Sequence, residues 1–227
     1  MSQAASRQEA RISKRIVLRG QVPGPAGTAV HAAKPCSGET RVFLLSPADA
    51  GGRRAKILFH PQARFELAER LRMAGVPLAE AFNFMSPLYF RGKLLYASTF
   101  ANAPSGIPGT LVITPCRGLL RPETIVGIEE FQEISNERVA VDNPRYRDPL
   151  ERDFGLLAQA IGSQVRVVLL GSIATRKYIP LLIERLGDRL VVPREFVGLG
   201  NMSRGALLLR CSRERHELEY IATTAIF

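Results

Sequence analysis

Two short runs of apolar, mostly β-branched residues constrain the fold of this chain most strongly. Residues 111–114 (LVIT) and 165–170 (VRVVLL) are nearly continuous, and each is stopped by a turn-forming residue, Pro115 or Gly171. Residues 42–45 (VFLL) and 190–192 (LVV) have the same character. Strands that are covered on both faces have this composition, which is typical of parallel sheets. The sequence therefore predicts a largely buried, mostly parallel sheet.

Segments with helical periodicity alternate with these runs. The clearest stripes of apolar residues lie within residues 61–74, 150–161 and 179–186, and a shorter helix is expected at residues 78–84. Strands that alternate with helices indicate an α/β protein, here a three-layer sandwich with a mostly parallel central sheet. We also expect strands at residues 55–59 and 206–209, an edge strand within residues 218–227, and an irregular excursion over residues 121–148.

The N-terminal part differs in composition from the rest. Residues 1–20 are polar and basic, and residues 21–40 are rich in Pro, Gly and Ala. We therefore expect a basic N-terminal arm and linker over residues 1–40, followed by an α/β domain over residues 41–227. The formal net charge is +10, and residues 1–60 hold ten Lys and Arg against three acidic residues. Such asymmetry suits a polyanionic partner, although a solvated basic surface has the same composition.

Several classes of protein are disfavoured by what the sequence lacks. It contains no apolar run long enough for a membrane helix and no apolar signal-peptide core at its start, so we expect a cytoplasmic protein with no membrane partner. Its three cysteines are scattered without metal-ligand spacing, so no metal site is expected. In residues 197–210 (VGLGNMSRGALLLR) the third glycine comes too late for a dinucleotide-binding fingerprint, so no cofactor is expected and the segment is interpreted as a strand–loop–strand connection.

The candidate site follows from the position of the strands. Ligands of open parallel sheets bind beyond the carboxyl ends of the strands. Small residues at those ends let main-chain N–H groups approach a ligand, and Arg and Lys supply positive charge. The alternative is that the small residues only turn sharp corners. The candidate ligand-binding residues at these ends are Ser46, Arg117, Gly171, Ser172, Tyr178, Asn201, Ser203 and Arg204.

Three residues are candidates for catalytic roles, each with a simpler alternative. Cys116 is a candidate nucleophile if the adjacent Arg117 lowers its pKa, or else a spectator thiol. Lys177 is a candidate desolvated amine or phosphate ligand, or else a solvated lysine. Asp49 is a candidate general base, or else a turn residue.

An aromatic-rich segment, residues 82–101, offers a further candidate surface. Here Tyr89 and Arg91 are candidates to stack a base and hold its phosphate. The alternative is that the aromatic residues pack in the core with one polar edge.

Four segments taken together resemble a known family. Residues 44–49 (LLSPAD), 86–101 (SPLYFRGKLLYASTFA), 112–126 (VITPCRGLLRPETIV) and 167–182 (VVLLGSIATRKYIPLL) resemble a bacterial α/β domain family of largely unassigned function. That family is related in layout to the peroxide-stress proteins, which bind nucleic acid. The chain departs from the family pattern at its usual serine-lysine turn, which reads Ser-Pro-Ala-Asp here.

A weaker similarity links residues 165–182 (VRVVLLGSIATRKYIPLL) to the central strand–Gly–helix unit of the uracil-DNA glycosylase superfamily. The His-Pro-Ser loop of that superfamily is replaced here by VPREFVGLGNMSRG. Both resemblances imply nucleic acid or its components as the partner, and neither supplies a reaction. We expect a nucleic acid, DNA rather than RNA, or a nucleotide-like ligand, with processing of a nucleobase or cleavage of an N-glycosidic bond as the reaction to consider. The alternatives are a non-catalytic DNA-binding or complex-forming protein that uses its basic arm, and a small-molecule enzyme.

Overall fold

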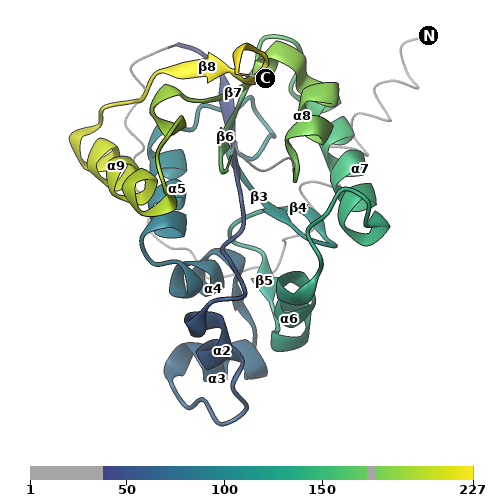
Figure 1. The fold of residues 1–227 in the computed structure, drawn as a ribbon, viewed down its shortest axis with the longest axis vertical. Coiled ribbons are helices and arrows are strands. Elements are labelled where there is room, and N and C mark those ends of the chain that lie inside the picture. Colours follow the sequence, from purple (N-terminus) through teal and green to yellow (C-terminus); the bar gives the residue numbers. More distant parts are fainter. Residues whose placement is uncertain (1–37, 173–176, 227) are drawn as a thin grey trace.

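The structure is a computed structural model, and it describes residues 38–172 and 177–226. A six-stranded sheet runs through its centre in the order β4-β3-β1-β6-β7-β8 (Figure 1). The inner strands β3, β1, β6 and β7 are parallel, and the two edge strands are antiparallel to their neighbours. The strands are β1 (Arg41–Leu45), β3 (Thr110–Thr114), β4 (Gly118–Leu120), β6 (Arg166–Leu170), β7 (Leu190–Pro193) and β8 (Tyr220–Ala222). The predicted mostly parallel sheet is confirmed, as is an edge strand near the C-terminus.

Successive residues of each inner strand face two separate hydrophobic cores. In β1, Phe43 and Leu45 belong to one core, whereas Val42 and Leu44 belong to the other, and none of the four is exposed. Side chains alternate between the faces of a sheet, so a strand that is covered on both sides needs apolar residues at every position. This is the physical reason for the unbroken apolar runs in the sequence.

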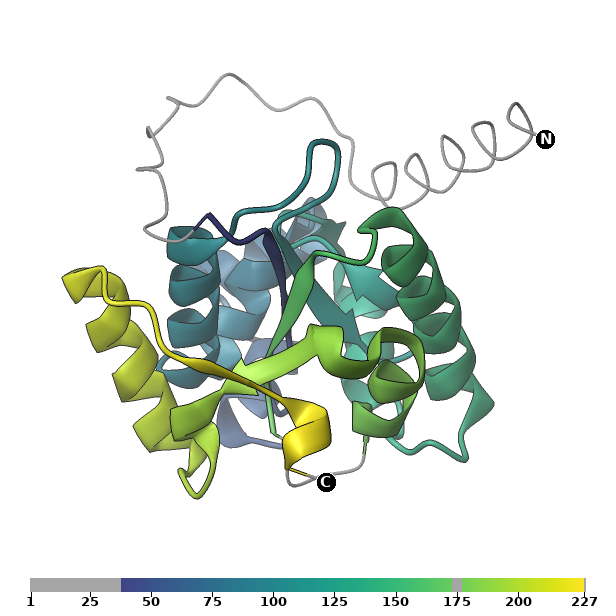
Figure 2. The ribbon, with the colours of Figure 1, turned by 90° about the horizontal axis from the view of Figure 1, so that it is seen from above.

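Helices cover both faces of the sheet, which completes a three-layer sandwich (Figure 2). Helices α5 (Tyr89–Phe100) and α9 (Asn201–Glu214) lie on one face, and α7 (Pro144–Ala160) and α8 (Ile179–Leu186) lie on the other. The first two cross in close backbone contact, because a Cβ on Gly92 would lie 2.8 Å from the main-chain oxygen of Gly205. The crossing holds the N-terminal turns of α5 and α9 against each other.

The remaining helices gather at the end of the sheet where β1 leads into α2 (Figure 1). They are α2 (Arg53–Phe59), α3 (Glu66–Met73), α4 (Leu78–Met85) and α6 (Ile128–Asn136). A two-stranded sheet of β2 (Val76–Pro77) and β5 (Ile125–Val126) ties this group together. Short 3-10 helices span Gly187–Arg189, Arg194–Phe196 and Thr223–Ala225. This group of helices forms one wall above the carboxyl ends of the parallel strands.

Two predicted strands are wrong, and both segments are helical. Residues 55–59 belong to α2, where Ala55 and Leu58 are buried and Lys56 and Ile57 are exposed, which is a helical spacing. Residues 206–209 belong to α9, which begins directly after Gly200. A short apolar run does not distinguish a strand from a buried helix, and in both segments tertiary packing decided.

The segment 121–148 is also more regular than expected. It contains β5, the whole of α6 and the start of α7, so the interpretation as an irregular excursion is wrong. Three of its acidic residues, Glu129, Glu130 and Glu133, lie on α6, where Phe131 and Ile134 provide the apolar face that packs on the core. The expected helices at residues 78–84, 150–161 and 179–186 correspond to α4, α7 and α8.

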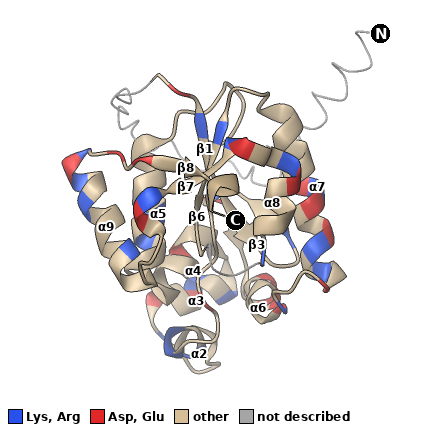
Figure 3. Ribbon diagram, turned by 45° about the horizontal axis from the view of Figure 1, so that its top comes forward, with Lys and Arg blue, Asp and Glu red and all other residues tan. Residues whose placement is uncertain are grey.

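The expected basic arm, residues 1–40, lies outside the described residues except for its last three. Within the described ranges, Lys and Arg gather on α2, whereas charges of both signs alternate along α7 (Figure 3). No helix in the described part of the chain is long and apolar enough to cross a membrane.

Candidate functional site at the carboxyl edge of the sheet

A cavity of about 740 Å³ opens at the carboxyl ends of β1 and β6. Its walls come from the loop after β1, the first turns of α5 and α9, the residue before α8, and the C-terminal end of α6. Seven of the residues singled out from the sequence line it together: Ser46, Asp49, Tyr89, Ser172, Lys177, Tyr178 and Asn201. The parallel strands therefore bring residues from distant parts of the chain to one place, as the carboxyl-edge argument predicts.

Lys93, on the second turn of α5, is the most unusual group in this cavity. It lines the cavity, yet only 1% of the residue is exposed. Its Nζ donates to the main-chain oxygen of Ser46 and lies 2.9 Å from Ser46 Oγ. The same nitrogen lies 4.5 Å from the ring centroid of Tyr89 and 5.0 Å from that of Phe90. Burial lowers the pKa of Lys93 to about 7, so much of the amine is uncharged at neutral pH.

Tyr178 closes the cluster from the start of α8. Its hydroxyl accepts a hydrogen bond from the main-chain N–H of Ser172 (3.0 Å) and donates to the carbonyl of the same residue (3.2 Å). Burial raises the pKa of Tyr178 to about 12. The hydroxyl fits here because Gly171 has no side chain: a Cβ on Gly171 would lie 2.6 Å from that hydroxyl and 3.0 Å from Ser46 Cβ. Gly171 thus serves the site by leaving space.

Arg204 and Tyr89 contribute two further buried polar groups. Arg204 Nη2 donates to the carbonyl of Phe196 (2.6 Å), and Nη1 donates to the carbonyl of Gly171 (3.4 Å). The Tyr89 hydroxyl is buried and interacts with the Arg204 side chain. Burial raises the pKa of Tyr89, and the positive charge of Arg204 partly opposes this. We call Ser46, Tyr89, Lys93, Tyr178 and Arg204 the buried polar cluster.

The more exposed lining residues lie at the mouth of the cavity. Asp49 Oδ1 accepts a hydrogen bond from the main-chain N–H of Gly51 (3.0 Å). This contact is typical of a turn residue, which is the simpler of the two interpretations of Asp49. Lys177 is exposed, and Asn201 begins α9. The N-cap of α9 is Gly200, which has no side chain to cap the first N–H groups of the helix. A helix N-terminus of this kind favours negative charge.

Cys116 and Arg117 lie elsewhere, in the tight turn between β3 and β4. Neither lines the cavity. Arg117 does act to lower the pKa of the Cys116 thiol, but burial, reinforced by Glu133, outweighs it and raises that pKa to about 11. At neutral pH the residue is a thiol, which is a poor nucleophile. Cys116 has a positive φ of 57°, so it contributes to the shape of the turn.

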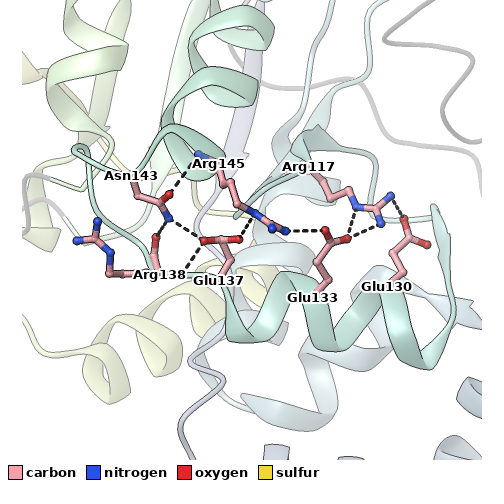
Figure 4. Close-up of polar contacts among 7 residues, drawn as sticks. All are labelled: Arg117, Glu130, Glu133, Glu137, Arg138, Asn143 and Arg145. Carbon is pink, nitrogen blue, oxygen red and sulfur yellow. Dashed lines mark hydrogen bonds and ion pairs between the residues drawn. The ribbon is translucent and has the colours of Figure 1, made fainter.

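Arg117 belongs to a chain of ion pairs along α6 (Figure 4). It pairs with Glu130 at 2.9 Å and with Glu133 at 2.6 Å. Arg145, from α7, pairs with the same Glu133 at 3.0 Å and with Glu137 at 2.9 Å. We call these five side chains, Arg117, Glu130, Glu133, Glu137 and Arg145, the α6 ion-pair row. The charge of Arg117 is therefore directed at α6 and away from the cavity.

Arg91 and Ser203 are also separate from the cavity. Both are exposed on their helices, and neither is among the residues that line it. In the aromatic segment around Arg91, Phe82, Phe90 and Tyr96 are buried core residues, so most of these rings pack inside the protein. Of this segment, Phe82, Met85, Ser86, Tyr89 and Lys93 line the cavity.

Lys93 was not among the predicted site residues, although its position in the sequence indicates an unusual environment. Tyr89, Lys93, Tyr96 and Phe100 follow the spacing of one helix face, and all four are buried. A lysine inside an apolar stripe predicts one of two arrangements: a side chain that extends its amine to the solvent, or an amine that is itself buried. The solvent exposure of the amine distinguishes them. Only the packing of α5 against β1 and α9 shows that the amine is buried.

Metal and disulfide chemistry have no visible basis in the described ranges. Cys116 and Cys211 are free cysteines there, and Cys36 lies outside them. No group of three or more His, Cys, Asp or Glu side chains among the described residues is arranged to hold a metal ion.

Comparisons with known proteins found no match among family models, curated proteins or solved structures. The structure defines an α/β sandwich with a cavity at the carboxyl edge of its sheet, and the buried polar cluster lies at that edge.

Proposed function

We propose that this protein binds a nucleotide-like ligand in the carboxyl-edge cavity. The observation that carries the proposal is the convergence of Lys177, the uncapped N-terminus of α9 and the buried polar cluster on one cavity of about 740 Å³. Small-molecule sites in proteins typically enclose about 300–1,000 Å³ and combine an apolar lining with a few fixed polar groups. The cavity has this size and character.

The two ends of such a ligand find different partners. A phosphate suits the mouth, because Lys177 and the first N–H groups of α9 supply positive charge there. A base or sugar suits the interior, where Phe82 and Tyr89 are apolar neighbours and Ser46 and Ser172 offer hydroxyl groups. Both family resemblances stated above agree with a ligand of this class.

Cleavage of an N-glycosidic bond needs a carboxylate to activate water. Asp49 and Glu137 are the two carboxylates that line the cavity. One oxygen of Asp49 accepts the bond from Gly51, and Glu137 pairs with Arg145. Both carboxylates therefore already have partners within the protein. We propose ligand binding, and glycosidic cleavage is one outcome that the test distinguishes.

The test is isothermal titration calorimetry of the full chain with a mononucleotide, the matching nucleoside and inorganic phosphate. We expect the mononucleotide to bind more tightly than either fragment. Lys177→Met should weaken binding about tenfold, which corresponds to ~1.4 kcal/mol. Lys56→Met is the matched control, because Lys56 is an exposed lysine that does not line this cavity. Equal losses in the two variants, or no binding at millimolar ligand, would contradict the proposal. Release of free base during the titration would instead establish glycosidic cleavage.

A second candidate function, DNA binding by the N-terminal arm, is favoured by the charge of the sequence. Six of the ten basic residues within residues 1–60 precede residue 38. Changing Arg11, Lys14, Arg15 and Arg19 to Gln in the full chain should abolish binding to a DNA duplex if the arm carries it. Binding that does not weaken as salt rises would exclude phosphate contacts as its source.

A further inference from the structure

We propose that Ser46 and Lys93 form a nucleophile–base pair that catalyses acyl transfer from an ester or amide. This activity goes beyond ligand binding, and it does not depend on the ligand being a nucleotide. A serine hydroxyl is a weak nucleophile until an adjacent base removes its proton, and in one recurring arrangement that base is a lysine amine. Two requirements follow: contact between the two side chains, and a lysine that is uncharged near neutral pH.

The contact is present in the structure. Lys93 Nζ lies 2.9 Å from Ser46 Oγ, which is within the range for direct proton transfer. The pair joins the end of β1 to the second turn of α5, two elements that pack directly against each other. Lys93 also donates to the main-chain carbonyl of Ser46, which fixes the amine beside that hydroxyl.

The environment of Lys93 favours the free amine. The residue is 1% exposed, and its nitrogen is surrounded by Ser46 and by the rings of Tyr89 and Phe90. Lys93 forms no ion pair with a described carboxylate, and a carboxylate there would favour the ammonium form. With the pKa lowered to about 7, an amine in this position is able to accept a proton from Ser46 at neutral pH.

The reaction divides into two balanced steps. Ser46 Oγ forms a bond to the acyl carbon while its proton passes to Lys93 Nζ. The carbon–leaving group bond then breaks, and Lys93 returns the proton to the departing alcohol or amine. Water attacks the acyl-serine in the second step: its proton moves to Lys93 and then back to Ser46 Oγ as the acid is released. No external oxidant, reductant or cofactor is needed.

Acyl transfer also needs a donor for the negative charge that develops on the carbonyl oxygen. The Tyr89 hydroxyl is buried beside the Arg204 guanidinium, and Tyr89 lines the same cavity as Ser46. We assign it this role. Tyr178 acts as a positioning residue, because its two bonds to Ser172 hold the end of β6 beside Ser46.

The groups that surround the pair define how its pH dependence should look. Tyr89 and Tyr178 have raised pKa values, so they stay protonated near neutral pH. The Arg204 guanidinium contacts the carbonyl of Gly171, and Asp49, Glu137 and Lys177 line the mouth. The lowered pKa of Lys93, about 7, predicts a titration of this amine near neutral pH.

The experiment uses a fluorophosphonate probe and p-nitrophenyl acetate with the full chain. We expect the probe to add to Ser46, as located by peptide mass spectrometry, at a rate that rises with pH through about 7. Lys93→Met should slow labelling and ester cleavage about 100-fold or more, in line with the usual contribution of a general base. Ser46→Ala should abolish both. Ser98→Ala and Lys56→Met, at exposed positions outside the cavity, are the matched controls.

Two results obtained with the variants would overturn the proposal. The first is labelling of Ser46→Ala at the rate of the unaltered chain, and the second is equal labelling of Lys93→Met. Should Lys93→Met fail to fold, as judged by circular dichroism, the pH profile of the unaltered chain decides. A labelling rate that stays constant between pH 6 and 8.5 would then exclude Lys93 as the base. Nucleotide binding without labelling would reject the dyad and leave the proposed function standing.

Discussion

The buried polar cluster and the α6 ion-pair row satisfy polar side chains in opposite ways. In the row, Arg117 and Arg145 each contact two glutamates, and all of these groups have some access to solvent. In the cluster, Lys93 is almost fully buried and its nitrogen contacts one serine and two rings. The row pairs each arginine with two carboxylates, whereas burial in the cluster lowers the pKa of the Lys93 amine.

This difference separates a buried amine with a lowered pKa from side chains held in partly exposed ion pairs. Exposed ion pairs are worth little individually, because water and salt screen them and the side chains lose freedom. A buried group that lacks a counter-charge changes its protonation state instead, and such groups gather at functional sites. We therefore look for reactivity in the cluster and for surface stabilisation in the row. Three predictions test this contrast.

The largest effect on stability is expected from Gly171→Ala. The added Cβ would lie 2.6 Å from the Tyr178 hydroxyl and 3.0 Å from Ser46 Cβ, so side chains of the cluster must move. Overpacking of this kind costs about 1–3 kcal/mol, and we expect the upper end, ~3 kcal/mol, in urea unfolding. Gly155→Ala is the control, because nothing lies within 4 Å of its Cβ and it sits inside α7. That control should leave stability unchanged or raise it by up to ~1 kcal/mol. Similar losses in both variants would contradict the role given to Gly171.

An intermediate effect is expected on the pH dependence of stability at Lys93. The pKa of this lysine is about 7 in the folded protein and 10.5 without burial, so the unfolded chain binds the extra proton between these values. The contribution of Lys93 to stability should therefore rise as pH increases from 7.5 to 9.5, by up to ~1.4 kcal/mol per pH unit and ~2 kcal/mol over that interval. Cys116, whose pKa is raised to about 11, acts in the opposite direction, so the rise is measured as the difference between the unaltered chain and Lys93→Met.

Lys93→Met should remove this rise, because methionine does not titrate. The measurement is the free energy of unfolding in urea at a series of pH values, kept below 10 so that tyrosines do not ionise in the unfolded chain. Lys56→Met should keep the slope of the unaltered protein. A slope that survives in Lys93→Met would show that the amine is solvated.

The smallest effect is expected from Glu133→Ala in the α6 ion-pair row. Arg117 retains Glu130 as a partner, and Arg145 retains Glu137, so neither arginine loses all of its ion pairs. The free energy of unfolding should fall by less than ~1 kcal/mol. The difference should shrink further at 1 M salt, where the Debye length is about 3 Å. A loss of more than ~2 kcal/mol that is insensitive to salt would mean that the row is as important as the cluster.

Much of the site could be inferred from the sequence, though unevenly. Ser46, Ser172 and Tyr178 could be predicted because they lie in the segments that follow strands β1 and β6, and parallel strands place their carboxyl ends at one edge of the sheet. Cys116 and Arg117 follow a strand end as well, yet the turn after β3 leads into an antiparallel edge strand and directs Arg117 towards α6. Adjacency to a strand end therefore does not decide which way a side chain faces. Lys93 was missed because its burial depends on contacts with distant parts of the chain. Its partner Ser46 directly follows β1 and lies 47 residues earlier in the sequence.

The glycine-rich segment 197–210 shows the same division. Its glycine spacing departs from that of a dinucleotide-binding loop, but the apolar run after it, which was expected to be a strand, is the body of α9. Gly205 accepts the close approach of α5, since a Cβ there would lie 2.9 Å from Tyr89 Cα. The reason for this glycine lies in a segment more than one hundred residues earlier in the chain.

The sequence by itself determined the class of fold, because a strand covered on both faces must be apolar at every position and a helix on its face must be apolar along one stripe. It also indicated the edge of the sheet at which polar residues gather. Only the tertiary structure decided which polar side chains share a cavity, which arginine is paired with glutamates, and which lysine loses its water. Desolvation and pairing depend on distances between elements that are far apart in the chain, and local periodicity carries no information about those distances.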